Sequence, residues 1–328
     1  MTRFFSSSNL IAYLFFLILI TLIWMPNIII GYQESSYYVF HEDNFNNWLE
    51  SWGNGNIQLI AFFLILILAA GFNIIYNQTD IVRSNTIIPA MLIFIIHGLH
   101  PFSPDYLRLL FAELLLLICL ARIMKIERQL KTNSIAIDSG ILFGLIFWLI
   151  PILGVGIFFV LIAISVLKAI HWREVFWAVS GFIIPGVFVT SAQYLLDLPI
   201  TWIPPSLIPL SEIAEPDNLK VFDMAFYICF ALLGLFSFWL LLSSYTRKTI
   251  RIKNLTKIFI LFLVFQSAVL ITSYFMGNME YGFVLLAIPL STILYSLLAS
   301  DRYQLVSKAL FFISIITVLT HNWLLLLN

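Results

Sequence analysis

Long apolar runs limit what this chain can fold into more than any other feature of its sequence. Eleven such runs are close to the length of a bilayer-spanning helix, which takes about 17 to 25 residues. They lie at residues 9–31, 57–76, 83–100, 104–124, 138–152, 153–169, 175–195, 222–244, 255–277, 281–299 and 306–326. Only 10% of the 328 residues are charged, whereas soluble domains carry about 25%. We therefore predict an all-α, polytopic transmembrane helix bundle of about 11 helices, forming a single integral membrane domain over residues 1–328.

Prolines and glycines predict where these helices are broken. Pro151 and Gly154 supply a turn, so the fifth and sixth runs are predicted as two helices rather than one re-entrant hairpin. Pro89, Pro185 and Pro289 lie inside three other runs and are expected to interrupt them. Broken helices bind ions in some transporters, but kinks held by packing are the simpler expectation.

The basic residues predict the orientation of the chain. Short loops rich in Lys and Arg remain on the cytoplasmic side of a membrane. With the N-terminus inside, every Lys and Arg except Arg108 and Lys220 falls on the inner side. Eleven crossings then place the C-terminus outside, in a multi-pass protein of the inner membrane. The formal net charge is zero, so the lipid bilayer is an expected partner and nucleic acid is not.

Two long outer loops are predicted, at residues 32–56 and 196–221, the second rich in proline. Large apolar side chains in the first recur with helical spacing at Phe45, Trp48, Leu49 and Trp52. This pattern predicts a short interfacial helix lying on the membrane. Glu42 and Asp43 precede it and can act as a general base or hold a divalent metal ion, or they form a solvated turn that caps the helix.

The predicted topology resembles the C-type family of membrane glycosyltransferases, in which the first outer loop carries acidic catalytic residues beside a membrane-parallel helix. Glu42 and Asp43 occupy the matching place. The resemblance implies an enzyme of envelope biogenesis that uses a polyprenyl-linked sugar, a polyprenyl-phosphate lipid being the partner. Arg108, His100 and Trp48 are then the expected substrate- or phosphate-binding residues. Arg108 can reach outward to a lipid phosphate or pair with an acid one turn away.

A pair of histidines lies between the third and fourth runs. His97 and His100 are three residues apart and share a helical face, which is a spacing that metal ligands use. The alternative is that His100 is solvated at a helix end while His97 bonds a backbone carbonyl.

Glu113 is predicted to lie deep in the membrane. If Pro104 begins the fourth helix, the 1.5 Å rise per residue places Glu113 about 15 Å deep. An acid there costs on the order of 2.5–3.5 kcal/mol and needs a partner. Gln266, in the middle of the ninth run, is the predicted partner at matching depth. Both a proton relay and a simple buried hydrogen bond fit this placement.

The whole chain also resembles an uncharacterised family of polytopic inner-membrane proteins from Bacteroidota, some of which carry the label beta-carotene monooxygenase-like. Six stretches in order carry this resemblance: Gly71–Ile75, Leu120–Ile123, Ala136–Gly140, Trp172–Glu174, Gly181–Pro185 and Leu286–Leu290. It implies topology and compartment. An oxygenase needs several histidines around iron, and only His97 and His100 have useful spacing.

Three functions remain open from the sequence. The leading hypothesis is the glycosyltransferase-like enzyme with Glu42 or Asp43 as base or metal ligand. The second is a non-enzymatic subunit or scaffold of an envelope assembly or transporter, which requires a membrane-protein partner. The third is a proton-coupled transporter that uses Glu113.

Overall fold

The computed structural model describes residues 10–30, 54–79, 86–98, 104–126, 132–168, 171–197, 221–245, 249–275, 279–298 and 304–327. Its helices are α1 (Leu10–Ile30), α3 (Asn54–Asn77), α4 (Ile88–His97), α5 (Pro104–Met124), α6 (Asn133–Leu149), η2 (Pro151–Val155), α7 (Gly156–Leu167), α8 (Trp172–Leu195), α9 (Val221–Tyr245), α10 (Ile250–Phe275), α11 (Met279–Leu285), α12 (Ala287–Leu298) and α13 (Gln304–Leu327). No strand occurs among these described residues. The prediction of an all-α fold is therefore confirmed.

Three helical segments among the described residues are long and apolar enough to cross a membrane. They are Asn56–Asn77, Trp172–Leu195 and Ile250–Ser273, and each contains an 18-residue window with no more than two charged side chains. Such segments are typical of membrane proteins. The prediction that the chain is a membrane protein is supported by these three helices.

The third apolar run does not form a spanning helix. We expected residues 83–100 to cross the membrane, but α4 has only 10 residues, about 15 Å of helix. The Asn77 side chain explains the late start: its Nδ2 donates to the Thr86 carbonyl at 3.0 Å, and its Oδ1 accepts from the Thr86 N–H at 3.3 Å. These bonds tie Thr86, two residues before α4, to the end of α3. Every residue of α4 is buried.

The predicted breaks are only partly correct. Residues Pro151–Val155 form η2, which separates α6 from α7 as expected. The run at 281–299 divides into α11 and α12 just before Pro289, because proline has no N–H to donate to the Leu285 carbonyl. However, Pro89 lies in the first turn of α4, and α8 continues through Pro185. The helical part of the run at 83–100 thus begins beside Pro89, whereas the expectation that Pro185 interrupts its helix was wrong.

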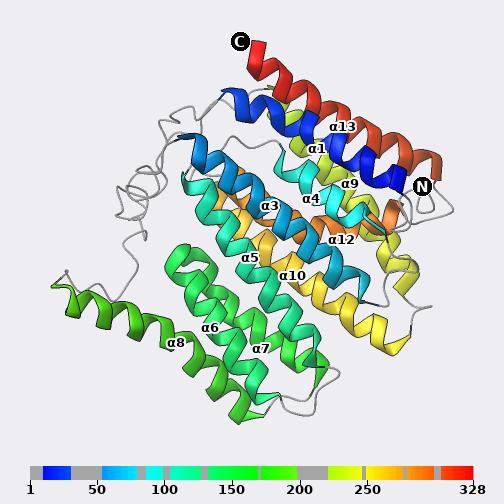
Figure 1. Ribbon diagram of the computed structural model, residues 1–328. Coiled ribbons are helices and arrows are strands. Elements are labelled where there is room, and N and C mark those ends of the chain that lie inside the picture. Colours follow the sequence, from blue (N-terminus) through cyan, green and yellow to red (C-terminus); the bar gives the residue numbers. More distant parts are fainter. Residues whose placement is uncertain are drawn as a thin grey trace.

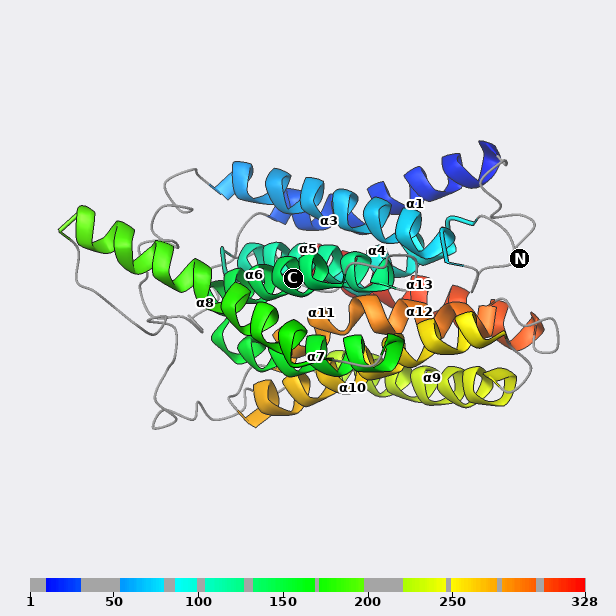
Figure 2. The same ribbon diagram turned by 90° about the horizontal axis from the view of Figure 1, so that it is seen from below.

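The helices are stacked in layers around α4 and α12. Figure 2 shows α1 and α3 on one face, α4, α5 and α6 beneath them, and α7, α9 and α10 on the opposite face. In Figure 1, α1 and α13 lie side by side at one edge, while α8 extends away at the other. The short helix α4 contacts α1, α3, α12 and α13. The end of α4 is therefore enclosed by helices from both ends of the chain.

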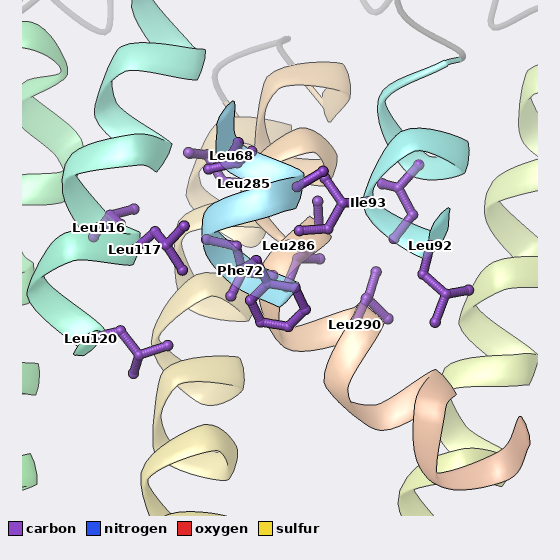
Figure 3. Packing of buried hydrophobic residues seen from close by; sticks show 14 of the residues in the cluster. Leu68, Phe72, Leu92, Ile93, Leu116, Leu117, Leu120, Leu285, Leu286 and Leu290 are labelled. Carbon is purple, nitrogen blue, oxygen red and sulfur yellow. The ribbon is translucent and has the colours of Figure 1, made fainter. Parts of the chain in front are cut away.

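One apolar core joins these layers. Figure 3 shows Leu68 and Phe72 of α3 facing Leu117 of α5, with Ile93 of α4 and Leu286 close by. All of these side chains are buried or nearly so. The core places α4 and α5 in fixed positions relative to α3.

Glu174 joins the start of α8 to the start of α6. Its carboxylate accepts the Thr132 hydroxyl hydrogen and the His171 N–H, the latter at 2.9 Å, and lies 4.0 Å from Lys168 Nζ. The His171 bond satisfies one of the backbone donors that every helix start leaves free. Glu174 therefore caps α8 and fixes it beside α6.

Glu174→Ala should lower the free energy of unfolding by about 1–2 kcal/mol, because it removes the cap and leaves the Thr132 hydroxyl without its acceptor. Thermal or detergent-induced unfolding would measure this loss. Glu174→Gln keeps one acceptor oxygen and should lose less. Equal stability of the alanine variant and the wild type would contradict the capping role.

Candidate functional site

A histidine and a glutamate form a fully buried pair at the end of α4. His97 Nε2 lies 3.0 Å from Glu113 Oε2, and both side chains have 0% relative exposure. His97 is in the last turn of α4, and Glu113 lies in α5, more than two turns after Pro104. Apart from this contact, the four polar atoms of the two side chains have no hydrogen-bond partner among the described residues. The pair therefore retains free capacity to bind a proton or a water molecule.

Tyr106 covers this pair from α5. It is seven residues before Glu113, so the two side chains lie on the same face of the helix. Its hydroxyl donates to the His97 carbonyl at 3.4 Å, and its ring meets the imidazole edge-on at 6.3 Å between centroids. Tyr106 is 1% exposed. It helps to shield the pair and binds the backbone that carries His97.

Asn322 of α13 holds the next carbonyl of the chain. Its Nδ2 donates to the Gly98 carbonyl at 2.6 Å and to the Ile23 carbonyl at 2.9 Å. The sequence analysis identified neither Tyr106 nor Asn322. The seven-residue spacing from Glu113 is a signal for Tyr106, whereas the partners of Asn322 lie more than 200 residues away in the chain and leave no local pattern.

The prediction for Glu113 was right about burial and wrong about the partner. Gln266 is also fully buried, but neither polar atom of its side chain is hydrogen-bonded to a described residue. His97, rather than Gln266, therefore faces the carboxylate. The alternative reading of His97, a hydrogen bond from its ring to a backbone carbonyl, is not found among the described residues either.

Arg108 is enclosed by protein in the structure, with 3% of its surface exposed. Its expected role in binding a phosphate stays a prediction. A buried guanidinium requires acceptor groups around it. Arg108 does have a polar, electrostatic or ring interaction with another group of the protein.

Several predicted site residues lie outside the described residues. These are Glu42, Asp43, Trp48 and His100. Their roles as base, metal ligand or substrate-binding residue stay predictions, and so do the interfacial helix and the proline-rich loop. Within the part of the chain that the structure describes, no group of three His, Cys, Asp or Glu side chains is placed to hold a metal ion.

Comparison with known proteins identifies a family but no activity. A model described as a family of unknown function, DUF6427, matches residues 46–324. No curated protein and no solved structure matches the chain. The matched range includes α3 to α12 and most of α13, and with them the His97–Glu113 pair. The prediction of an uncharacterised family is thus confirmed, and the chain belongs to DUF6427.

Proposed function

We propose that this chain is a multi-pass inner-membrane protein that binds and releases protons at His97 and Glu113 and couples their movement to transport of a solute. The observation that carries the proposal is the 3.0 Å contact between two titratable side chains that are both fully buried. Ionisable groups inside membrane proteins are costly and commonly mark proton or ion pathways. A purely structural role would be served as well by two apolar side chains.

The pair can change its net charge by one in either direction. With one proton shared, it is either a neutral imidazole beside a carboxylic acid or an imidazolium beside a carboxylate, and both forms have no net charge. A second proton gives imidazolium and carboxylic acid, with one positive charge. Loss of the shared proton leaves one negative charge. Because an unbalanced charge is expensive in a low-dielectric interior, such a step favours a conformation that exposes the pair to water.

The helices around the pair support a transport role. Helix α4 is short, buried over its full length and ends at His97, and it packs against α12, which follows the break after α11. Discontinuous helices in the centre of a bundle are where many secondary transporters bind their coupling ions. Apolar side chains line most of α4 and α12, so the His97–Glu113 pair is the natural centre of such a site.

Glu113→Gln tests this proposal because glutamine keeps the shape of the side chain but cannot carry the proton. Infrared difference spectra recorded across a pH step should show a carboxylic acid band in the wild type that is absent from the variant. In vesicles containing a pH-sensitive dye, proton entry driven by a potassium diffusion potential should also be lost. Asp138→Asn is the matched control, since that acid is 40% exposed and pairs with Arg122 at 3.7 Å.

The control variant should retain both the infrared band and proton entry. Proton entry at the wild-type rate in a correctly inserted Glu113→Gln protein would overturn the proposal. So would an infrared band that Glu113→Gln leaves unchanged.

A further inference from the structure

The end of α4 is held by a side chain from the far end of the sequence. The last carbonyls of any helix lack partners within the helix, and at α4 this applies to the residues around His97 and Gly98. The Asn322 amide nitrogen has two hydrogens, and both are used: one for the Gly98 carbonyl and one for the Ile23 carbonyl of α1. Asn322 itself is fully buried.

Gly98 is packed so tightly that its position is fixed from three sides. A Cβ at this residue would lie 2.5 Å from Ile23 Cγ2 and 3.1 Å from Val318 Cγ1, both closer than normal contact. The Gly98 N–H also donates to the Phe94 carbonyl at 3.0 Å, which continues the helical bonding. Gly98 therefore lies tightly between α1 and α13. Asn322 of α13 donates hydrogen bonds both to Gly98 and to Ile23 of α1, so it joins the three helices.

Two consecutive carbonyls at this point are bound by different helices. The His97 carbonyl accepts from Tyr106 of α5, and the Gly98 carbonyl accepts from Asn322 of α13. The bond to Asn322 is the shorter, at 2.6 Å against 3.4 Å for Tyr106. Small rotations at a helix end would move the His97 ring relative to Glu113, so whatever fixes the end also fixes the pair.

We propose that Asn322 is the positioning residue of the proton site: by holding the Gly98 carbonyl it keeps His97 facing Glu113. The positioning of His97 is a statement about geometry, and only its effect on proton transfer rests on the function proposed above. Asn322 also joins α1 and α13 to the end of α4, so movement of these two helices changes the geometry of the pair. The proton occupancy of His97 and Glu113 is in this way coupled to the position of α1 and α13.

Asn322→Leu is the primary test, because leucine keeps the number and branching of the side-chain heavy atoms and has no amide donors. Solid-state NMR of protein in lipid vesicles, labelled with ¹⁵N-histidine and ¹³C-glutamate, should show a through-space correlation between the His97 ring nitrogen and the Glu113 carboxyl carbon. His97→Gln identifies this signal by removing it. We expect the correlation to be lost in Asn322→Leu and kept in Asn73→Leu, a matched control whose Oδ1 is buried without a hydrogen-bond partner among the described residues.

Proton entry separates positioning from general stability. Asn322→Leu should slow proton entry in the wild-type background and have no further effect in a His97→Gln background, because the positioned group is then absent. A folded Asn322→Leu protein that keeps both the correlation and wild-type proton entry would overturn the proposal. If Asn322→Leu slowed proton entry by the same factor in the wild-type and His97→Gln backgrounds, the proposal would also be overturned.

A wild-type measurement keeps the inference testable if the leucine variant does not fold. Protein labelled with ¹⁵N-asparagine and with ¹³C at the glycine carbonyl should show a close contact between the Asn322 amide and Gly98, and its absence would refute the positioning role. The two proposals fail separately. Normal proton entry in Glu113→Gln removes the transport function, whereas the NMR correlations test the geometry alone.

Discussion

His97→Leu should lower the free energy of unfolding by about 3–5 kcal/mol, the cost of leaving one member of a buried pair without its partner. Glu113 would remain fully buried, with neither carboxyl oxygen hydrogen-bonded to a described residue. The carboxyl group would then have to be protonated or draw water into the core, and either change costs free energy. Equilibrium unfolding in mixed detergent, followed by circular dichroism, would measure the difference.

The double variant His97→Leu/Glu113→Leu is the decisive comparison. It removes both polar groups, so it should regain much of the stability that the single variant loses. The coupling between the two sites should reach about 0.5–3 kcal/mol, as for other contacting residues. Gln266→Leu is the matched control: its amide has no hydrogen-bond partner among the described residues, so its removal should cost little or stabilise. Strictly additive effects of the two single changes would show that His97 and Glu113 do not interact.

The burial of Glu113 could be predicted from the sequence because it depends on local information. Pro104 begins α5 as expected, and the fixed rise of a helix then places Glu113 more than two turns along it, where the side chain is fully buried. The identity of its partner could not be predicted in this way. His97 reaches Glu113 because α4 ends after 10 residues at a point where its last side chain meets α5.

Apolar composition also failed to distinguish two kinds of surroundings. Helix α4 and the exposed helix α8 come from similar apolar runs, but α4 is enclosed by protein and α8 presents Trp172, Phe188 and Leu195 outward. A run that is apolar on all sides indicates burial, either in lipid or in protein. The length of the run is then the main guide to which of the two surrounds the helix. For α4 that length was shortened by bonds between Asn77 and Thr86, which no hydropathy pattern records.

Gly140→Leu should separate α8 from the rest of the protein and lower the free energy of unfolding by about 3 kcal/mol, at the upper end of overpacking costs. Helices α6 and α8 form the most extensive helix pair of the fold. A Cβ on Gly140 would lie 2.2 Å from the Ala178 carbonyl oxygen, and one on Gly181 would lie 2.4 Å from the Ile137 carbonyl oxygen. These neighbours are backbone atoms, which cannot rotate away. Gly140 and Gly144 have the four-residue spacing that allows close approach of membrane helices.

Gly186→Leu provides the control within α8, because a Cβ there would meet only the Trp148 side chain, at 3.4 Å. We expect this variant to remain close to the wild type in stability. The distance between spin labels placed at the exposed positions Leu145 of α6 and Phe188 of α8 should stay unchanged in Gly186→Leu and lengthen in Gly140→Leu, since the second change separates the helices. Because α8 contacts α6 and α7 but lies away from α4, Gly140→Leu should leave the NMR contact between His97 and Glu113 intact. If the NMR contact between His97 and Glu113 were lost when α8 separates, α8 would support the buried pair, contrary to the packing described above.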